Sequence, residues 1–371
     1  MKLVSLEECC EILDAKRIPI TAKDRKKGPY PYYGANGVQD YVADYIFDDE
    51  LVLLAEDGGN FGSEERPIAY RVSGKCWVNN HAHVLKPKAG MNVDYLCYSL
   101  MFYKVDGMVN GATRMKLTQA AMRKMMIPAR KIEEQKAIVG ILDKVHTLIA
   151  AEKEQLKKYD ELLKSRFVEM FGDLNKNSKN YPVKGLSEIS SYWNGLTYKP
   201  SDTAEEGEGT LVLRSSNIQN GVLVFDDNVY VKCKIKEKLL VRDNDILMCT
   251  RNGSAALVGK TALIKGLTKP TTFGAFMMII RSEYYSYLKT YFETPFFRNQ
   301  ISTGTTTINQ ITGRMLNEVQ IPAPDIHTVR QFEIFVHQNS KSKSTVEESI
   351  EKLEMLKKSF MQQYFGRNAG T

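Results

Sequence analysis

One stretch of the chain repeats hydrophobic residues in steps of four and three, the spacing of a heptad seam, and a second stretch is also amphipathic. In the first stretch the apolar positions are Ile138, Leu142, Val145, Ile149, Leu156, Tyr159, Leu163, Phe167 and Met170, with Glu152 as the one polar occupant. Pro128 precedes this stretch, and Gly172 follows it as a candidate C-terminal stop. The pattern predicts a helix of about 40 residues, which is about 60 Å long at about 1.5 Å per residue.

A second helical stretch lies near the end of the sequence. Its apolar positions are Phe332, Phe335, Val346, Ile350, Leu353, Leu356, Phe360 and Tyr364. Its middle, HQNSKSKST, is polar, and Ser344 with Glu347 has the spacing of a capping box. This pattern indicates a break between 339 and 345, where the helix can restart. The two seams can bury each other, and either can also face a partner protein.

Short runs of β-branched and aromatic residues lie between the helical stretches, separated by Gly, Asn and Asp. Examples are GANGVQDYV (34–42), ELVLLAEDGG (50–59), GTLVLRSSNIQNGVLVF (209–225) and FGAFMMII (273–280), and VDYLCYSLMFYK (93–104) is a short helical piece. No regular alternation of strand and helix suggests a doubly wound parallel sheet. The sequence therefore predicts an α+β fold.

The sequence contains an internal repeat. Residues 127–173 and 321–367 both begin with Ile-Pro-Ala, both contain Leu-x-Lys-Ser, and both carry Phe-Gly near their ends at an offset of 194. FDDELVLLAEDG (47–58) aligns with RDNDILMCTRNG (242–253) at an offset of 195. Chance similarity is the alternative, but the shared landmarks keep one order. The repeat predicts a tandem of globular unit, long helix, globular unit, long helix.

The charge is uneven along the chain. The 371 residues hold 51 Lys and Arg against 44 Asp and Glu, a formal net charge of +7. Residues 1–129 and 130–171 each carry a net +1, whereas residues 172–371 carry a net +5. This balance suits a polyanion partner that is bound by local patches rather than by a uniformly basic surface.

The cysteines indicate a reducing compartment. The six cysteines form no C-x-x-C pair and no zinc-binding spacing. The start, MKLVSLEECCEIL, carries acidic residues within its apolar stretch, and no apolar run is long enough for a membrane span. We therefore expect a cytoplasmic protein.

The stretch RNGSAALVGKT (251–261) ends like a phosphate-binding P-loop. Five residues separate Gly253 from Gly259, whereas a P-loop has four between its glycines. In the repeat, Gly259-Lys260-Thr261 aligns with Glu64-Glu65-Arg66, and two acids do not suit a phosphate cradle. An ATP site is therefore not predicted here.

Other patterns for catalysis or metal binding are weak. Glu134 and Lys136 give an E-x-K spacing, but a solvated helical face explains them. His81 and His83 place two imidazoles on one side of a strand, yet no third ligand stands near them in the sequence. Neither a methyltransferase motif of the Asn-Pro-Pro-Tyr type nor a G-x-S-x-G motif is present. We predict no catalytic residue and no metal site.

Four stretches of the first globular unit strengthen a resemblance to a known family. They are YPYYGANGVQDYV (30–42), LLAEDGGNFG (53–62), VNNHAHVL (78–85) and GATRMKL (111–117). Each alone is a weak signal, but their order and the doubling of the pattern make the match strong. With two globular units and two long helices, each entered through Ile-Pro-Ala and left through Phe-Gly, the chain resembles the specificity subunit of type I restriction–modification systems.

The resemblance implies a DNA-binding subunit without catalysis of its own. In this family each target recognition domain reads one half of a split, asymmetric DNA site, and the two helices form a spacer that sets the gap between the halves. The helices also dock two methyltransferase subunits, which methylate adenine, and restriction subunits can join. We therefore expect double-stranded DNA and these subunits as partners, and no membrane. S-adenosylmethionine, ATP and Mg are expected on the partner subunits and not on this chain.

The resemblance also implies a specific fold class. It is an α+β fold in which two α/β target recognition domains alternate with two long antiparallel coiled-coil helices, as a pseudo-twofold tandem repeat. The expected boundaries are 1–129 for the first recognition domain, 130–172 for the central spacer helix, 173–323 for the second recognition domain and 324–371 for the C-terminal spacer helix.

Candidate DNA contacts follow from the chemistry of base edges and phosphates, which favours Arg, Lys, Asn, Gln, Ser and Thr in loops. In the first unit they are Lys26, Lys27, Tyr32, Tyr33, Asn36, Asn60, Arg114 and Lys116. In the second unit they are Arg214, Ser216, Asn217, Arg251, Asn252, Lys260, Thr306, Thr307 and Asn309. A solvated polar turn is the alternative for each, and Tyr32 and Tyr33 can equally belong to the core. Because the second unit has RNGSAALVGKT where the first has an acidic loop, we expect the two domains to read different sequences.

Two other classes of function stay open at the level of the sequence. One is a stand-alone DNA-processing enzyme, either a nuclease or an ATPase, against which the missing catalytic pattern argues. The other is a coiled-coil adaptor that does not touch nucleic acid.

Overall fold

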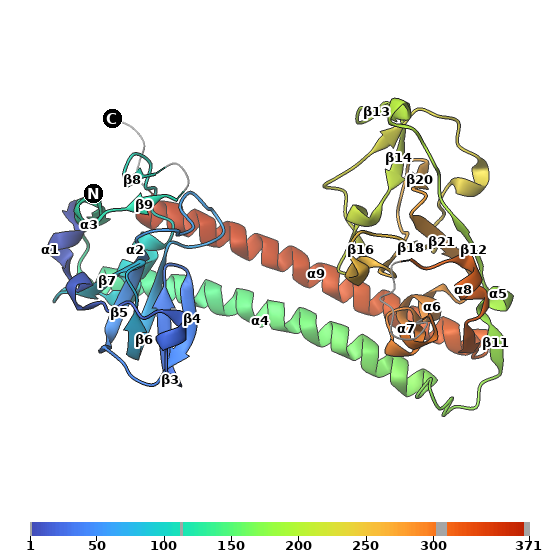
Figure 1. The fold of residues 1–371 in the computed structure, drawn as a ribbon, viewed down its shortest axis with the longest axis horizontal. Coiled ribbons are helices and arrows are strands. Elements are labelled where there is room, and N and C mark those ends of the chain that lie inside the picture. Colours follow the sequence, from blue (N-terminus) through green and yellow to red (C-terminus); the bar gives the residue numbers. More distant parts are fainter. Residues whose placement is uncertain (1, 112–113, 302–309, 367–371) are drawn as a thin grey trace. The chain divides into compact units, whose positions relative to one another are not determined.

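The computed structural model describes residues 2–111, 114–301 and 310–366 (Figure 1). The chain forms two compact units. Unit 1 comprises Met1–Glu154 and Glu348–Thr371, and unit 2 comprises Gln155–Glu347. Both long helices therefore contribute residues to both units.

Unit 1 is built on a mostly antiparallel sheet. Its strands are β1 (Leu3–Ser5), β2 (Cys10–Ile12), β3 (Lys27–Gly34), β4 (Gly37–Val42), β5 (Phe47–Ala55), β6 (Ala69–Val78), β7 (Ala82–Pro87), β8 (Val109–Asn110), β9 (Lys116–Leu117) and β10 (Met126–Pro128). Its helices are α1 (Leu6–Cys9), α2 (Val93–Met101), α3 (Gln119–Arg123), the first part of α4 (Ile132–Phe171) and the last part of α9 (Ile326–Phe365). The main sheet has the order β2-β7-β5-β6-β3-β4, in which β3 and β6 pair in parallel.

The sheet of unit 1 has two apolar faces because side chains alternate along β5. Val52 and Leu54 lie in the core that contains residues of α2 and Leu142 of α4. Leu51 and Leu53 lie in a second cluster on the other face. The helices therefore cover one face of the sheet. The apolar side chains of β5 are buried on both faces.

Unit 2 contains a similar set of elements. Its strands are β11 (Val183–Gly185), β12 (Ser191–Asn194), β13 (Thr203–Ala204), β14 (Thr210–Leu213), β15 (Ile218–Gln219), β16 (Val222–Leu223), β17 (Tyr230–Val231), β18 (Ile246–Cys249), β19 (Thr261–Leu263), β20 (Thr271–Phe273), β21 (Met277–Arg281) and β22 (Gln320–Pro322). Its helices are α5 (Leu186–Ile189), α6 (Tyr285–Tyr291), α7 (Pro295–Ile301), α8 (Gly313–Asn317) and part of α9 (Ile326–Phe365).

The two units share one internal strand order. The antiparallel order β2-β7-β5-β6 of unit 1 matches β12-β21-β18-β19 of unit 2. The parallel pair β3 and β6 matches the parallel pair β14 and β20. The long strand β6 thus corresponds to two short strands, β19 and β20, with residues 264–270 between them. The internal repeat seen in the sequence is therefore also a repeat of sheet topology.

The sheet register corrects one sequence alignment. Leu54 pairs with His83 in unit 1, and Met248 pairs with Met278 in unit 2. Leu54 and Met248 both lie on the face that the helices cover, so they are equivalent at an offset of 194 rather than 195. A shift by one residue would move every side chain of the strand to the opposite face.

The predicted helices are present, and the predicted seam of α4 is largely buried. Residues Ile138, Leu142, Val145, Ile149 and Phe167 are at most 6 % exposed. The helix ends at Phe171, and Gly172 follows with a φ of 75°, as its role as a stop requires. In α9 the stripe is less complete, because Leu356 is 42 % exposed.

The two helices run antiparallel within each unit. In unit 1, Lys153 pairs with Glu354 and Arg130 contacts the backbone of Tyr364. In unit 2, Lys343 lies 2.5 Å from Asp160, and the ring of Phe167 lies 5.6 Å from that of Phe332. In both cases, later residues of α4 contact earlier residues of α9.

The predicted break at 339–345 is wrong, because α9 is continuous from Ile326 to Phe365. Tertiary contacts hold the polar stretch in the helix. Asn339 is 6 % exposed, Val346 is 9 % exposed, and Lys343 forms its ion pair with Asp160 of α4. Such contacts override the weak helix propensity of Ser, Asn and Thr and the local capping pattern.

Candidate nucleic-acid interface

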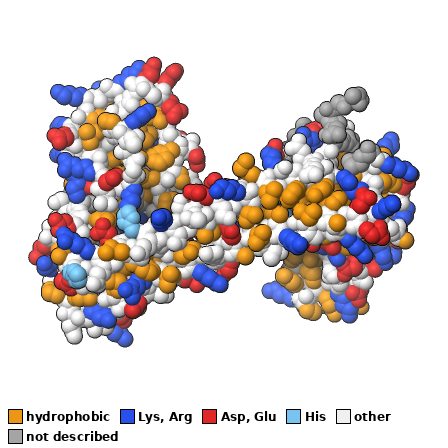
Figure 2. Space-filling view, turned by 180° about the vertical axis from the view of Figure 1, so that it is seen from behind, with side chains coloured by type: hydrophobic (Ala, Val, Ile, Leu, Met, Phe, Trp, Pro, Cys, Tyr) orange, Lys and Arg blue, Asp and Glu red, His pale blue; other side chains and the backbone are white. Residues whose placement is uncertain are grey.

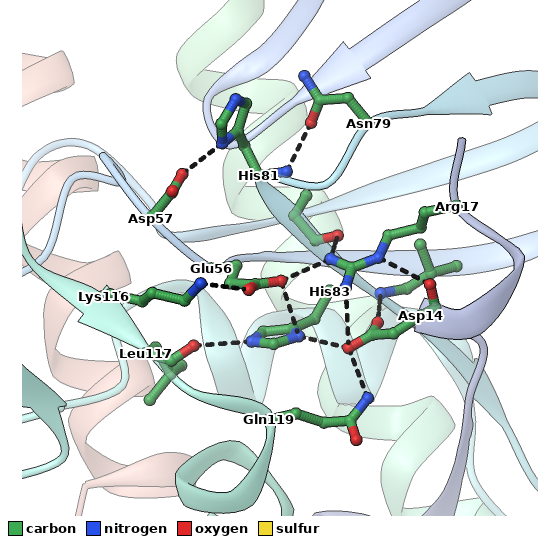
Figure 3. A network of polar contacts seen from close by, with 12 residues as sticks. Asp14, Arg17, Glu56, Asp57, Asn79, His81, His83, Lys116, Leu117 and Gln119 are labelled. Carbon is green, nitrogen blue, oxygen red and sulfur yellow. Dashed lines mark hydrogen bonds and ion pairs between the residues drawn. The ribbon is translucent and has the colours of Figure 1, made fainter. Parts of the chain in front are cut away.

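The loop after β5 in unit 1 carries two acidic residues, Glu56 and Asp57, directly after the buried end of the strand. Backbone hydrogen bonds hold it between two other segments. The N–H of Glu56 donates to the carbonyl of His81 (2.9 Å), and the N–H of Leu117 donates to the carbonyl of Glu56 (2.7 Å). The sheet therefore fixes the positions from which both carboxylates project (Figure 3).

A buried network of charged side chains lies next to this loop (Figure 3). His83 on β7 is fully buried, with Nδ1 2.6 Å from the carboxylate of Asp14 and Nε2 2.9 Å from the carbonyl of Leu117. Both ring nitrogens of His83 are therefore engaged with oxygen atoms of the protein. Arg17 donates to Glu56 (2.6 Å), and Gln119 donates to Asp14 (2.9 Å).

Contacts with the cations lower the pKa of both carboxyl groups in the network. Burial alone raises the pKa of Glu56, but hydrogen bonds from Arg17 and Lys116 outweigh burial and bring that pKa below its usual value. Burial likewise raises the pKa of Asp14, and the contact with His83 outweighs it. Both groups are carboxylates at neutral pH, so the network is a closed set of ion pairs.

Asp14, Glu56 and His83 lie close enough to share a metal ion, with their ligand atoms within 4.8 Å of one another. The contacts argue against such a site. Both nitrogens of His83 are already engaged, and Arg17 and Lys116 occupy the carboxylate of Glu56. A histidine ligand needs an unprotonated nitrogen. These residues do not fit a metal.

A second, more exposed group of side chains surrounds Asp57. Its carboxylate lies 2.6 Å from Nδ1 of His81 and accepts from Arg114 (2.9 Å). Asn36 donates to the carbonyl of Gly58 (3.0 Å). Gly58 has a φ of 62°, and a Cβ there would lie 3.2 Å from Nε of Arg114. The glycine therefore permits both the turn and the close packing of the guanidinium.

Unit 2 gathers several sequence candidates around the loop after β18. Asn252 donates to Oγ of Ser215 (2.9 Å). Lys260 donates to the carbonyls of Ser215 and Ile218, the latter at 2.8 Å. Arg214 forms an ion pair with Asp227 (2.8 Å). The fold thus brings together polar residues from three separate segments of the sequence.

The contacts of Lys260 also bear on the resemblance to a P-loop. Its ammonium group is held by backbone carbonyls, and the segment continues into strand β19. A P-loop continues into a helix, whose N-terminus helps to bind the phosphates. The Gly259-Lys260-Thr261 segment therefore lacks the structural context of a phosphate cradle.

Arg251 occupies the position in unit 2 that Asp57 has in unit 1. The pairings Asp57 with Lys116 and Arg251 with Gln310 are equivalent bridges. The guanidinium of Arg251 lies 5.4 Å from the ring centroid of Phe276, and the N–H of Thr250 donates to the carbonyl of Phe276 as that of Glu56 does to His81. An ion pair in one unit is replaced by a cation–π contact in the other.

Two sequence candidates are buried and are not available to DNA. Tyr32 is 1 % exposed, and its hydroxyl accepts from the N–H of Ile20 (3.1 Å). Asn217 is fully buried, and its amide group bonds to the backbone of Arg214 and Val224. Asn favours such local backbone bonds, which here stabilise a turn. Tyr32 and Asn217 are therefore no longer candidates for DNA contact, because both side chains are buried.

The other candidates differ in exposure. Those that are exposed are Lys26, Lys27, Asn36, Arg114, Lys116 and Arg251. Those that are half-buried are Tyr33, Asn60, Arg214, Ser216, Asn252 and Lys260. Thr306, Thr307 and Asn309 lie outside the described residues. DNA contact by the described, accessible members stays a prediction.

Sequence reasoning missed several polar residues that the fold places near these candidates. Arg25, Gln39 and Asn79 line a cavity in unit 1 together with Arg114. The run Asn79-Asn80-His81 between β6 and β7 indicates a polar loop, but in the sequence its histidine suggests only a metal ligand. Arg17 and Asp14 carried no such signal, because their partners are remote in the sequence.

Charged side chains of both signs are mixed on the surface, as expected for local rather than uniform positive patches. On the face shown in Figure 2, Lys and Arg side chains (blue) are interspersed with Asp and Glu side chains (red). Among the described residues, the helices that are long enough to span a bilayer are too polar to do so.

The fold and these clusters define a class of α+β protein with two topologically repeated units, each presenting polar loops at the ends of its sheet strands. Residues 1–159 match the family model described as the type I restriction modification DNA specificity domain. The resemblance predicted from the sequence is therefore confirmed.

Curated relatives align with part of the chain. A Haemophilus influenzae protein named as a type I restriction enzyme specificity subunit is 38% identical over 143 residues, which are 38% of this chain and 37% of that protein. The StySPI specificity subunit of Salmonella potsdam is 28% identical over 159 residues, covering 41% of this chain and 34% of that protein. The matches thus span about a third of the length of these relatives.

Solved structures extend the likeness in fold to nearly the whole chain. The S subunit of a type I restriction–modification system from M. genitalium has a TM-score of 0.57 at 12% identity and covers 98% of this chain and 96% of that chain. A structure described for complex assembly and conformational transition of the type I system has a TM-score of 0.55 at 16% identity, covering 99% and 98%. At these identities the likeness shows the fold alone.

Proposed function

We propose that this chain is a DNA specificity subunit of a type I restriction–modification complex. Each unit reads one half of a bipartite, asymmetric DNA site. The observation that carries the proposal is that equivalent positions of one repeated scaffold hold different side chains, Asp57 with His81 in unit 1 and Arg251 with Phe276 in unit 2. Different side chains on one backbone frame are what two different half-sites require.

The helices α4 and α9 are proposed to form the spacer between the two recognition units. Their antiparallel contacts within each unit support a continuous coiled coil in a pseudo-twofold repeat. Half-sites one DNA turn apart are separated by about 34–36 Å, and a helix of about 40 residues is long enough to bridge that spacing. The same helices would dock two methyltransferase subunits.

The chemistry of the complex is assigned to its partners. This chain supplies recognition and no catalytic group, S-adenosylmethionine binds the methyltransferase subunits, and ATP and Mg bind restriction subunits. The closed ion pairs of the Asp14 network and the backbone contacts of Lys260 support this division, because they leave neither a metal site nor a phosphate cradle there.

A selection experiment tests the proposed function. The full chain, alone and with its methyltransferase subunits, is mixed with double-stranded DNA of random sequence, and bound DNA is sequenced. We expect one bipartite motif with a fixed gap. The absence of any enriched motif, or turnover of ATP or DNA by the purified chain alone, would contradict the proposal.

Shortening the helices tests the spacer. Removal of one heptad from 138–170 together with the facing heptad of α9 is expected to change the preferred gap and to leave both half-site sequences unchanged. Altered half-sites with an unaltered gap would show that the helices do not set the spacing.

A further inference from the structure

Unit 1 contains an open cavity of about 390 Å³ beside the loop after β5, and polar side chains form part of its lining. Its lining includes Arg25, Gln39, Asn79, His81 and Arg114. We propose that this cavity reads the edge of a guanine in one DNA half-site, with Arg114 and Arg25 as the groups that contact the base. The inference rests on the proposed function and adds to it a location and a base.

Three side-chain acceptors near the cavity, those of Gln39, Asn79 and Asp57, are already used within the protein. Oε1 of Gln39 accepts from Asn79 (3.0 Å), and Oδ1 of Asn79 accepts from the N–H of His81 (2.8 Å). The carboxylate of Asp57 is held by His81 and Arg114. The lining therefore offers the amide nitrogen of Gln39 and the guanidinium groups as donors, and a ligand that presents acceptors matches them.

Both arginines are oriented by other groups. Arg25 lies 4.2 Å from the ring centroid of Tyr32, donates from Nε to the carbonyl of Ile20 (3.2 Å), and lies 3.4 Å from Asp40. Its Nη2 group has no partner among the described residues and is left for a ligand. Arg114 is held by Asp57 through Nη2. A guanidinium fixed in this way suits the two acceptors of guanine, N7 and O6, in the major groove.

The charge balance favours a base edge over a phosphate. The two guanidinium groups are each paired with a carboxylate, Asp40 and Asp57, so the four groups carry no net charge. Phosphate binding gains most from uncompensated positive charge, whereas base recognition depends on the direction of the donors.

Two glycines give the donors their positions. A Cβ at Gly34 would lie 2.2 Å from Nε2 of Gln39, and a Cβ at Gly58 would lie 3.2 Å from Nε of Arg114. A side chain at Gly34 would therefore displace the Gln39 amide, and one at Gly58 would crowd the Arg114 guanidinium. Gly34→Ala is expected to displace the Gln39 amide without removing any donor.

The test uses 7-deazaguanine, which lacks the N7 acceptor. The full chain with its methyltransferase subunits is titrated with its selected DNA, in which single guanines are replaced one at a time. For one guanine of one half-site, we expect the replacement to weaken binding by about 10- to 100-fold. Arg114→Ala is expected to weaken binding to normal DNA similarly and to abolish the difference between the two DNAs.

Control variants separate the outcomes. Arg66→Ala removes an exposed arginine of the same unit that does not line the cavity, and it is expected to keep the full sensitivity to 7-deazaguanine. Arg114→Ala is expected to fold, because its side chain is 59% exposed, and a thermal melt checks this. Gln39→Ala and Arg25→Ala should change the base preference at the same half-site.

Three results would overturn the inference. Equal weakening by Arg114→Ala on every DNA sequence would show contact with a phosphate. Unchanged selectivity in all the cavity variants, with a bipartite motif retained by the wild type, would leave the proposed function standing without the cavity. Failure of the wild type to select any motif would reject the proposed function and the inference with it.

Discussion

The loops after β5 and β18 occupy equivalent places in the two units, but different forces hold them. In unit 1, Asp57 pairs with His81, and the neighbouring Glu56 joins a buried network of ions. In unit 2 the same backbone positions hold Arg251, stacked on Phe276, and Thr250. Two backbone hydrogen bonds are shared: Glu56 N–H to His81 and Leu117 N–H to Glu56 in unit 1 match Thr250 N–H to Phe276 and Ile311 N–H to Thr250 in unit 2.

This difference shows which part of the scaffold can vary. The sheet register is fixed by burial on both faces, because a slip of one residue would expose the apolar side chains. The positions just beyond the strand end are free of this constraint and can exchange a carboxylate for a guanidinium. A repeated fold can thus carry two binding specificities.

Breaking the buried network should have the largest effect. His83 of unit 1 corresponds to Met278 of unit 2, and both are buried. His83→Met removes the imidazole that lies 2.6 Å from the buried carboxylate of Asp14 and leaves Arg17 at 3.5 Å, so we expect unit 1 to lose about 3–5 kcal/mol of stability. Chemical denaturation measures the change. The matched control, Met278→Leu, should cost less than about 1.5 kcal/mol, and equal losses would contradict the comparison.

The second prediction concerns binding. Arg251→Ala removes the exposed guanidinium of unit 2, and we expect a loss of about 1–3 kcal/mol in affinity for the selected DNA. The preference should change in one half-site only, and Arg114→Ala should change the other half-site. Selection from random DNA measures both. If both variants altered the same half-site, the assignment of one half-site to each unit would be wrong.

The third prediction follows from the lowered pKa of Glu56 and Asp14. A carboxyl group with a lower pKa in the folded state adds stability above its unfolded pKa, and that stability is lost as the pH falls toward the folded pKa. Unit 1 should therefore weaken below about pH 4.5, the ordinary pKa of a glutamate. Hydrogen exchange at pH 6 and pH 4 measures each unit separately.

Glu56→Gln tests whether the carboxyl group of Glu56 causes the loss of stability at low pH. It should reduce the stability of unit 1 at pH 6 and flatten the change between pH 6 and pH 4. Glu65→Gln, at an exposed position of the same unit, should behave like the wild type. An unchanged pH dependence in Glu56→Gln would place the acid sensitivity elsewhere.

The local patterns in the sequence predicted the helices well, because the seam of α4 from Ile138 to Phe167 keeps steps of four and three with Glu152 as its one polar occupant. The continuity of α9 could not be read locally, since contacts such as that of Lys343 with Asp160 hold its polar middle. The alignment of the loops failed by one residue because it matched Gly58 with Gly253. Only Gly58 of the two has a positive φ, so the shared glycine did not mark a shared turn.

The candidate site was predicted only in part for a related reason. Single exposed residues such as Arg114 and Arg251 stand in loops, where a sequence pattern can find them. The network of Asp14, Arg17 and His83 and the cavity beside it depend on strands β2, β5 and β7 becoming neighbours. That adjacency is a property of the topology, and no local pattern encodes it.

The smallest expected effect tests the contact that replaces the ion pair in unit 2. Phe276 is 59% exposed, so its ring contributes little to the core and serves mainly as a surface for Arg251. Phe276→Leu keeps an apolar side chain and removes the π face, and we expect a loss of about 0.5–1 kcal/mol in DNA affinity because Arg251 is less well oriented. A double-mutant cycle with Arg251→Ala measures the coupling between the two residues. Strict additivity would mean that Phe276 acts on DNA independently of the arginine, and the analogy with the orienting role of His81 for Asp57 would then fail.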